Sequence, residues 1–124
     1  MKAKIIAFGN LQAIGFRTYA KLIAKRLQIK GYAKNRDDGS VEIYANAPKR
    51  VIEKFLQRIN VKGDKDNILS LHVEATTVYP EGHKNYLAPI TWHFPFDIHY
   101  GACFSTGTRE LIEAKEAQLL ILAE

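Results

Sequence analysis

The sequence predicts an α+β sandwich in which two helices cover one face of an antiparallel sheet. Short stretches of alternating apolar residues and two stretches of helical periodicity follow one another in the order βαββαβ. Two strand–helix–strand crossovers around a central hairpin bring four strands into one sheet. This ferredoxin-like plan serves many unrelated functions and therefore assigns none of them.

The first expected strand spans residues 2–8. Every second residue of this stretch is small or apolar and is expected to face the core, namely Ala3, Ile5 and Ala7. The opposite face carries Ile6 and Phe8, so this strand is partly apolar on both sides.

The first helix is expected over residues 16–31. Its apolar side consists of Phe16, Ala20, Ile23 and Leu27. A second side is basic and consists of Arg17, Lys21 and Lys25. Gly31 has the residue type of a C-cap, so we expect the helix to end there.

A hairpin is expected over residues 32–47, with its turn at residues 37–39, Asp-Asp-Gly. The alternating apolar residues of its second strand are Val41, Ile43 and Ala45.

Residues 47–59 predict the second helix, with Pro48 in its first turn. Its expected buried stripe consists of Ile52, Phe55, Leu56 and Ile59. After a polar connection, residues 68–78 alternate as a strand, with Leu69, Leu71, Val73 and Ala75 on one face.

The remainder of the chain has weaker patterns. Residues 82–95 have the character of an insertion, and residues 94–101 predict a fifth strand. Residues 108–124 are good helix formers, and their apolar end, "LLILA", needs a cover. We therefore expect one domain over residues 1–100, with residues 101–124 as its C-terminal helical extension, which offers a surface for a homodimer.

The composition is that of a soluble globular protein, with 47% hydrophobic and 25% charged residues in a chain of 124. No apolar stretch approaches the roughly 18 residues of a membrane span, and the start is too short for a signal peptide. The one cysteine, Cys103, excludes an internal disulfide and fits a reducing cytoplasm. We therefore expect a cytoplasmic protein without a membrane partner.

Positive charge is concentrated in the first half of the chain, which makes that half attractive to anions. Residues 1–60 contain 13 Lys and Arg against 4 Asp and Glu, a balance of +9. Residues 61–124 contain 5 against 9, a balance of −4, and the two balances sum to the net charge of +5.

The connection between the first strand and the first helix, residues 9–16, is bracketed by Gly9 and Gly15. Glycines let a backbone approach a ligand closely, and a helix start offers N–H groups without internal partners. Arg17 follows in the first helical turn, where the helix dipole disfavours a cation. A bound phosphate would explain the arginine, because its guanidinium can make two parallel hydrogen bonds to phosphate oxygens.

Two motifs resemble one known family. "GNLQAIGFR" (9–17) is similar to the acylphosphatase signature, commonly written G-x-V-Q-G-V-x-F-R. "GYAKNRDDGSVEIYANAP" (31–48) resembles the segment that follows it in that family, G-W-V-R-N-x-x-D-G-S-V-E-V-x-A-x-G-P. The resemblance covers roughly residues 2–80, and the gap between the motifs accommodates one helix.

The resemblance implies a hydrolase of small acyl phosphates, with the substrate or inorganic phosphate as its ligand. It implies that Arg17 binds the phosphate and that Asn35 orients the attacking water. It implies a backbone cradle formed by Leu11, Gln12, Ala13, Ile14, Gly15 and Phe16. No metal, cofactor or covalent intermediate is implied.

Departures from the family pattern leave a second hypothesis open. Ala13 stands where the family has glycine, and a Cβ at a position of positive φ costs on the order of 1 kcal/mol. Residues 101–124 extend beyond the family's usual end. An inactive acylphosphatase-like scaffold that binds a partner is therefore the main alternative.

Two further hypotheses are weaker. "KGYA" (30–33) matches the start of an RNA-recognition box, but that box continues with Phe-Val and lies on the third strand, so we expect no nucleic acid. The four histidines lack zinc-site spacing with cysteine, so we expect no metal. They are His72, His83, His93 and His99.

Overall fold

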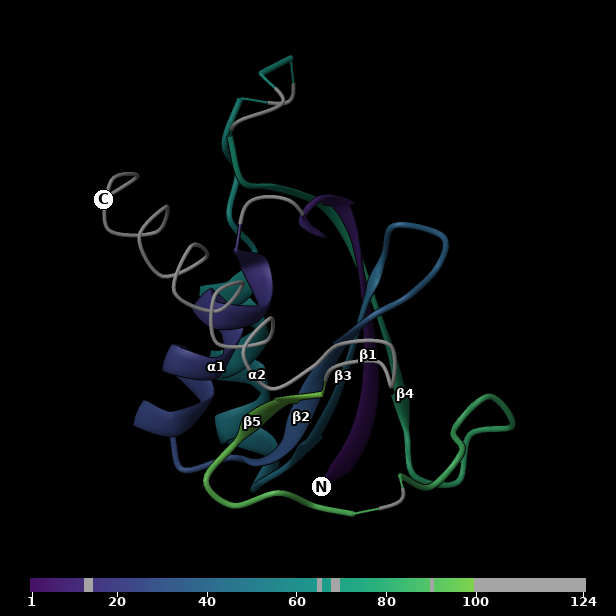
Figure 1. Cartoon of the computed structure of the whole chain (residues 1–124). Coiled ribbons are helices and arrows are strands. Elements are labelled where there is room, and N and C mark those ends of the chain that lie inside the picture. The colour runs from purple at the N-terminus through teal and green to yellow at the C-terminus, as the bar shows by residue number, and fades with distance from the viewer. Residues whose placement is uncertain (13–14, 65, 68–69, 90, 100–124) are drawn as a thin grey trace.

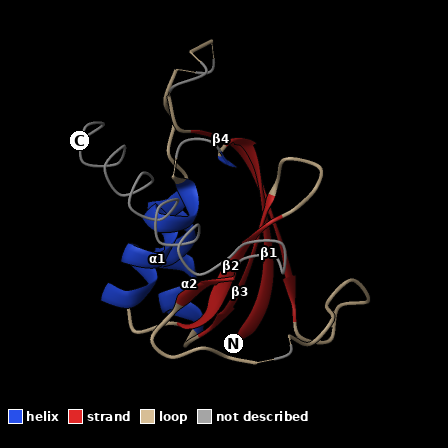
Figure 2. Cartoon of the chain, in the orientation of Figure 1, coloured by secondary structure: helices blue, strands red, loops and turns tan. Residues whose placement is uncertain are grey.

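The computed structural model describes residues 1–12, 15–64, 66–67, 70–89 and 91–99. The elements in chain order are β1 (Lys2–Asn10), α1 (Phe16–Arg26), β2 (Lys30–Asn35), β3 (Val41–Asn46), α2 (Lys49–Ile59), β4 (His72–Pro80) and β5 (Asp97–His99). The predicted βαββαβ order is confirmed, and both helices lie on one side of the sheet (Figures 1 and 2). The helix expected over 108–124 lies outside the described residues.

The strands form one sheet in the order β4-β1-β3-β2-β5. The pairs β1–β3, β1–β4 and β2–β3 are antiparallel, as expected. The fifth strand is confirmed within residues 94–101, but it runs parallel to β2, so the sheet is mixed. The connection from β4 to β5 passes from one edge of the sheet to the other, and the Gly31 N–H donates to the His93 carbonyl at 2.8 Å.

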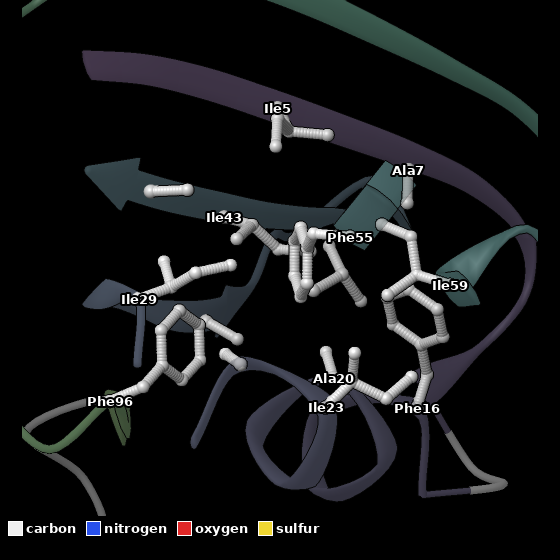
Figure 3. Packing of buried hydrophobic residues seen from close by; sticks show 14 of the residues in the cluster. Ile5, Ala7, Phe16, Ala20, Ile23, Ile29, Ile43, Phe55, Ile59 and Phe96 are labelled. Atoms are coloured by element: carbon white, nitrogen blue, oxygen red, sulfur yellow. The ribbon is translucent and has the colours of Figure 1, made fainter. Parts of the chain in front are cut away.

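The hydrophobic core lies between the sheet and the two helices (Figure 3). The predicted inward residues of β1 and β3 are fully buried, with Ile5 and Ile43 at 0% exposure. Phe16 and Ile23 of α1 and Phe55 of α2 pack against them. Of the stripe expected on α2, Leu56 is only partly buried.

Helix α1 ends earlier than the residue types suggest, so the expectation of a C-cap at Gly31 is wrong. The helix stops at Arg26, and Gln28 adopts the left-handed conformation with φ 57°. The Ile29 N–H donates to the Ala24 carbonyl at 2.9 Å, and the Gln28 N–H donates to the Lys25 carbonyl at 3.1 Å. These are the two bonds of a Schellman motif, which turns the chain and buries Ile29.

Strand β4 also departs from the alternation read in the sequence. Val73 faces the core, but Ala75 pairs with Phe8 on the opposite face, so its expected inward position is wrong. Phe8 of β1 pairs with Ala75 of β4, and Gly9 pairs with Val73. Glu74 therefore has no partner on β1 and is the extra residue of a β-bulge. Gly9 has φ 143°, and a Cβ there would lie 2.1 Å from the His72 carbonyl oxygen. Gly9 therefore permits close approach of β4.

The sheet face away from the helices is partly covered by the segment after β4. Tyr44 of β3 donates its hydroxyl to the Leu87 carbonyl at 2.7 Å, and its ring centroid lies 6.1 Å from that of Trp92. Tyr32, beside it on β2, contacts His93 with ring centroids 5.9 Å apart. Both tyrosines are buried, at 5% and 9% exposure.

Burial raises the pKa of Tyr44 to about 12, and the nearby charge of Glu42 adds to the rise. The pKa of Tyr32 is raised for the same two reasons. The hydroxyl of Tyr44 is therefore held in its neutral, hydrogen-bonding form well into the alkaline range.

We predict that Tyr44→Phe reduces the loss of folding stability at alkaline pH. The folded-state pKa of Tyr44 lies above the ordinary value of 10, so the unfolded chain releases the proton first and stability falls from about pH 10 to about pH 12. The variant should lose about 1 kcal/mol near neutrality, with the bond to Leu87. It should then lose less stability than wild type between about pH 10 and 12, measured by urea unfolding. Parallel losses in both proteins would contradict the assignment.

Candidate active site

The connection between β1 and α1 leads directly into the first turn of the helix. Gly15 is the N-cap residue of α1 and adopts a left-handed conformation, φ 83° and ψ 25°. A non-glycine residue is strained there. No acidic residue occupies the first turn of α1, so the partial positive charge at this helix start is not neutralised from within the turn. The position suits an anion.

Both ends of this connection are anchored in the core. The side chains of Leu11 and Phe16 are each 1% exposed. The Phe16 N–H donates to the Leu11 carbonyl at 3.4 Å, which closes the connection into a tight loop. The central residues of the expected cradle, Ala13 and Ile14, lie outside the described residues.

Gln12 has a role that the sequence did not suggest. Its side-chain amide Nε2 donates to the carbonyl of Arg36 at 2.7 Å and to the carbonyl of Ser40 at 2.9 Å. Both acceptors belong to the hairpin between β2 and β3, where the Arg36 N–H also donates to the Ser40 carbonyl at 2.9 Å. The Gln12 side chain therefore fixes the loop to the hairpin, and Figure 1 shows both at the same end of the sheet.

The turn of this hairpin is stabilised from within. Asp38 accepts hydrogen bonds from the Ser40 N–H, at 3.0 Å, and from the Ser40 hydroxyl. These bonds lower the pKa of the Asp38 carboxyl. Ser40 is buried at 2% exposure, so the acceptor that Gln12 uses lies in a well-defined position.

Asn35 is the last residue of β2 and pairs with Val41 of β3. Strand alternation places its side chain on the same face as Ala33, which is part of the core beneath the helices. The Asn35 Oδ1 atom is buried and has no hydrogen-bond partner among the described residues. An unsatisfied buried carbonyl costs about 1–3 kcal/mol, so this oxygen is suited to accept a bond from a bound water.

Arg17 is more buried than we expect for a residue on the basic, solvent-facing side of a helix. The sequence grouped it with Lys21 and Lys25 on a basic side of α1, but its side chain is only 7% exposed. Its Nε atom is buried and makes no hydrogen bond, although the residue has other interactions. Lys21, one turn further on, makes an ion pair with Asp97 of β5, with Nζ and Oδ1 3.3 Å apart. Arg17 therefore differs from the other two residues of that side.

The arrangement brings together segments that are far apart in the sequence. Gln12 belongs to the loop that precedes Arg17, and its acceptors belong to the hairpin that follows Asn35. The two candidate catalytic residues therefore come from segments held in a fixed relation. Within the described part of the chain, no three His, Cys, Asp or Glu residues are grouped so that they could hold a metal ion. No described helix has the length and apolar character needed to cross a membrane.

Comparisons with known proteins agree on one family. The sequence model of the acylphosphatase family matches residues 3–85. An acylphosphatase of Thermotoga maritima is 38% identical over 87 residues, which is 69% of this chain and 94% of that protein. An acylphosphatase of Archaeoglobus fulgidus is 43% identical over 56 residues, which is 45% of this chain and 63% of that protein.

Solved structures share the fold, and one of them is an acylphosphatase. The crystal structure of acylphosphatase from Bacillus subtilis matches with a TM-score of 0.56 and 30% identity, over 80% of this chain and 98% of that chain. The structure of HypF from T. kodakarensis matches with a TM-score of 0.54 and 27% identity, over 80% of this chain but only 12% of that much longer chain.

We predict that Gln12→Ala lowers the free energy of unfolding by about 1–2 kcal/mol, because two hydrogen bonds to the hairpin are lost. Gln12→Glu should cost more at neutral pH, because its carboxylate would face two carbonyl oxygens. Urea unfolding measures both. Gln57→Ala, at an exposed position of α2, is the matched control. Equal stability of Gln12→Ala and Gln57→Ala would show that the two bonds do not hold the loop.

Proposed function

The chain belongs to the acylphosphatase family, and we propose that it hydrolyses small acyl phosphates at the site formed by the loop 11–16, Arg17 and Asn35. The observation that carries the assignment of the site is the buried Asn35 Oδ1, which lacks a partner among the described residues. It lies at the end of the strand whose hairpin Gln12 fastens to the loop. A phosphate at the start of α1 and a water on Asn35 would complete this arrangement.

The phosphoryl group is held by charge and by backbone donors. The start of α1, with Gly15 as its N-cap and no acidic residue in its first turn, would offer the positive end of the helix dipole to a phosphate, and the proposed cradle 11–16 would add backbone donors. The Arg17 guanidinium supplies a full positive charge and a planar set of donors, which matches two phosphate oxygens. Because Arg17 is 7% exposed, its interaction with an anion is screened little by solvent.

The reaction needs little beyond positioning. A bond forms between the water oxygen and phosphorus while the bond from phosphorus to the acyl oxygen breaks, and the carboxylate departs with the bonding electron pair. The proton of the water passes to an oxygen of the departing phosphate. A carboxylate is a good leaving group, so catalysis can consist of binding the phosphoryl charge and orienting the water. Asn35 can orient the water as a neutral acceptor without a shifted pKa.

The remaining parts of the proposal concern the setting of the reaction. The sequence favours the cytoplasm, given its single Cys103. We propose that residues 101–124 extend the same domain and offer a surface for a second copy of the chain. The RNA-binding alternative finds no support at Tyr32, because this ring is 9% exposed and contacts His93 rather than presenting a face to a base.

Hydrolysis of acetyl phosphate or benzoyl phosphate, measured with and without a chelator, tests the activity. We expect equal rates in both conditions and competitive inhibition by inorganic phosphate. Arg17→Lys should lose about 100-fold or more in kcat/KM, because an ammonium cannot make the paired contact. Arg50→Lys, at an exposed position of α2, is the control and should keep full activity. Full activity of Arg17→Lys would remove the argument for paired binding.

Asn35→Ala separates positioning of the water from binding of phosphate. We expect kcat to fall about 100-fold while the inhibition constant of phosphate changes by less than about threefold. The variant should fold with unchanged or slightly greater stability, because the buried Oδ1 has no partner to lose among the described residues. Loss of phosphate affinity in a stable Asn35→Ala protein would show that Asn35 binds the phosphate instead.

A further inference from the structure

A groove of about 310 Å³ lies on the sheet face opposite the helices. Its floor is formed by β1 and β4, and its rim by the hairpin after β2 and by the segment after β4. Three cationic side chains line it, Lys4, Arg36 and Lys84. Three apolar or aromatic ones, Ile6, Phe8 and Tyr79, lie between them. We propose that this groove is a second binding site, for a small phosphorylated ligand that carries a flat aromatic ring, of the size of a nucleoside monophosphate.

The groove is separate from the candidate active site. Ile6 and Phe8 alternate with Ile5 and Ala7, which face the helices, so the two sets point to opposite sides of the sheet. Arg36 lines the groove, while its neighbour Asn35 is on the helix-covered side. A ligand in the groove therefore does not occupy the loop 11–16.

The charges of the groove favour an anion. Lys4 lies on the floor, with Nζ 3.4 Å from the Glu42 carboxylate and 6.0 Å from the centre of the Tyr79 ring. Arg36 and Lys84 form no ion pair with an acidic side chain in the described part of the chain, although Arg36 helps to lower the pKa of Asp38. Lys4 is balanced by Glu42. Of the other two cations, Lys84 lies at the Lys4 end, where Lys4 donates to the Asn85 carbonyl, while Arg36 lies at the Phe8 end, next to Asn35. The groove therefore keeps a positive excess, and Lys84 is the cation at the Lys4 end that has no acidic partner among the described residues.

The apolar part of the groove favours a flat ring. Phe8 is 40% exposed and Leu87, on the rim, is 68% exposed, so both leave apolar surface in contact with water. Phe8 pairs with Ala75 and Lys4 pairs with Tyr79, so the two aromatic side chains stand four residues apart along the strands. That spacing is about 13 Å, so the groove is long enough for a ligand with a ring at the Phe8 end and a phosphate toward the Lys4 and Lys84 end. The volume of the groove is within the range of small-ligand sites.

Titration of the full chain with adenosine monophosphate, followed by amide NMR shifts, tests the proposal. The shifts should map to residues 4–8, 79 and 84–87, and they should persist when inorganic phosphate saturates the site at Gly15 and Arg17. Adenosine and inorganic phosphate alone should each bind the groove at least about tenfold more weakly, because each offers half of the recognised chemistry. The NMR shifts report binding and do not depend on hydrolysis. Failure of this test would therefore not contradict the proposed activity, and loss of the proposed activity would not contradict the groove.

Charge-reversal variants complete the test. Lys84→Glu should weaken binding of adenosine monophosphate by about fivefold or more, since a rim cation becomes an anion. Lys54→Glu, at an exposed position of α2 on the other side of the sheet, should change it by less than twofold. Equal binding by Lys84→Glu and wild type would overturn the proposal. So would displacement of the nucleotide by phosphate from the loop 11–16, or a far stronger, steeply salt-dependent affinity for single-stranded RNA.

Discussion

The candidate site depends on the two hydrogen bonds that the Gln12 side chain donates to the hairpin, to the carbonyls of Arg36 and Ser40. The residues that they join are 24 and 28 positions apart in the chain. The first strand carries the loop, the second carries Asn35, and β3 lies between those two strands in the sheet. Asn35 therefore lies on a strand that does not pair with β1, and the Gln12 side chain gives the loop a direct link to the hairpin that follows Asn35.

Much of the fold was predictable because it follows from local patterns. Alternation at Ile5 and Ala7 predicted the buried side of β1, and periodicity at Phe16 and Ile23 predicted the buried side of α1. The failures concern features that backbone geometry decides. Gln28 takes the left-handed position that glycine usually fills, and the bulge at Glu74 reverses the faces of β4 beyond it. The parallel direction of β5 depends on a connection that crosses the sheet, which no local pattern encodes.

The sequence suggests a chemistry for the candidate site, but it does not predict the environment of the candidate residues. A cation in the first turn of a helix suggested a phosphate at Arg17, and the resemblance to a family suggested Asn35. Neither argument predicted that Arg17 is buried to 7% exposure or that the Asn35 Oδ1 is buried without a partner among the described residues. The role of Gln12 was missed for the same reason: its acceptors are backbone carbonyls, which leave no signal in the residue types around them.

The hairpin between β2 and β3 takes part in both sites, and strand alternation keeps their chemistry apart. Asn35 belongs to the helix-covered face, while the side chain of Arg36 lines the groove on the other face. Arg36 contributes to the first site only through its carbonyl, which accepts from Gln12. Every residue type supplies such a carbonyl, so the side chain at position 36 is free to serve the groove without removing the bond that fixes the loop. Asn35, the last residue of β2, and Arg36, which follows it, can thus serve two different ligands on opposite faces of one small sheet.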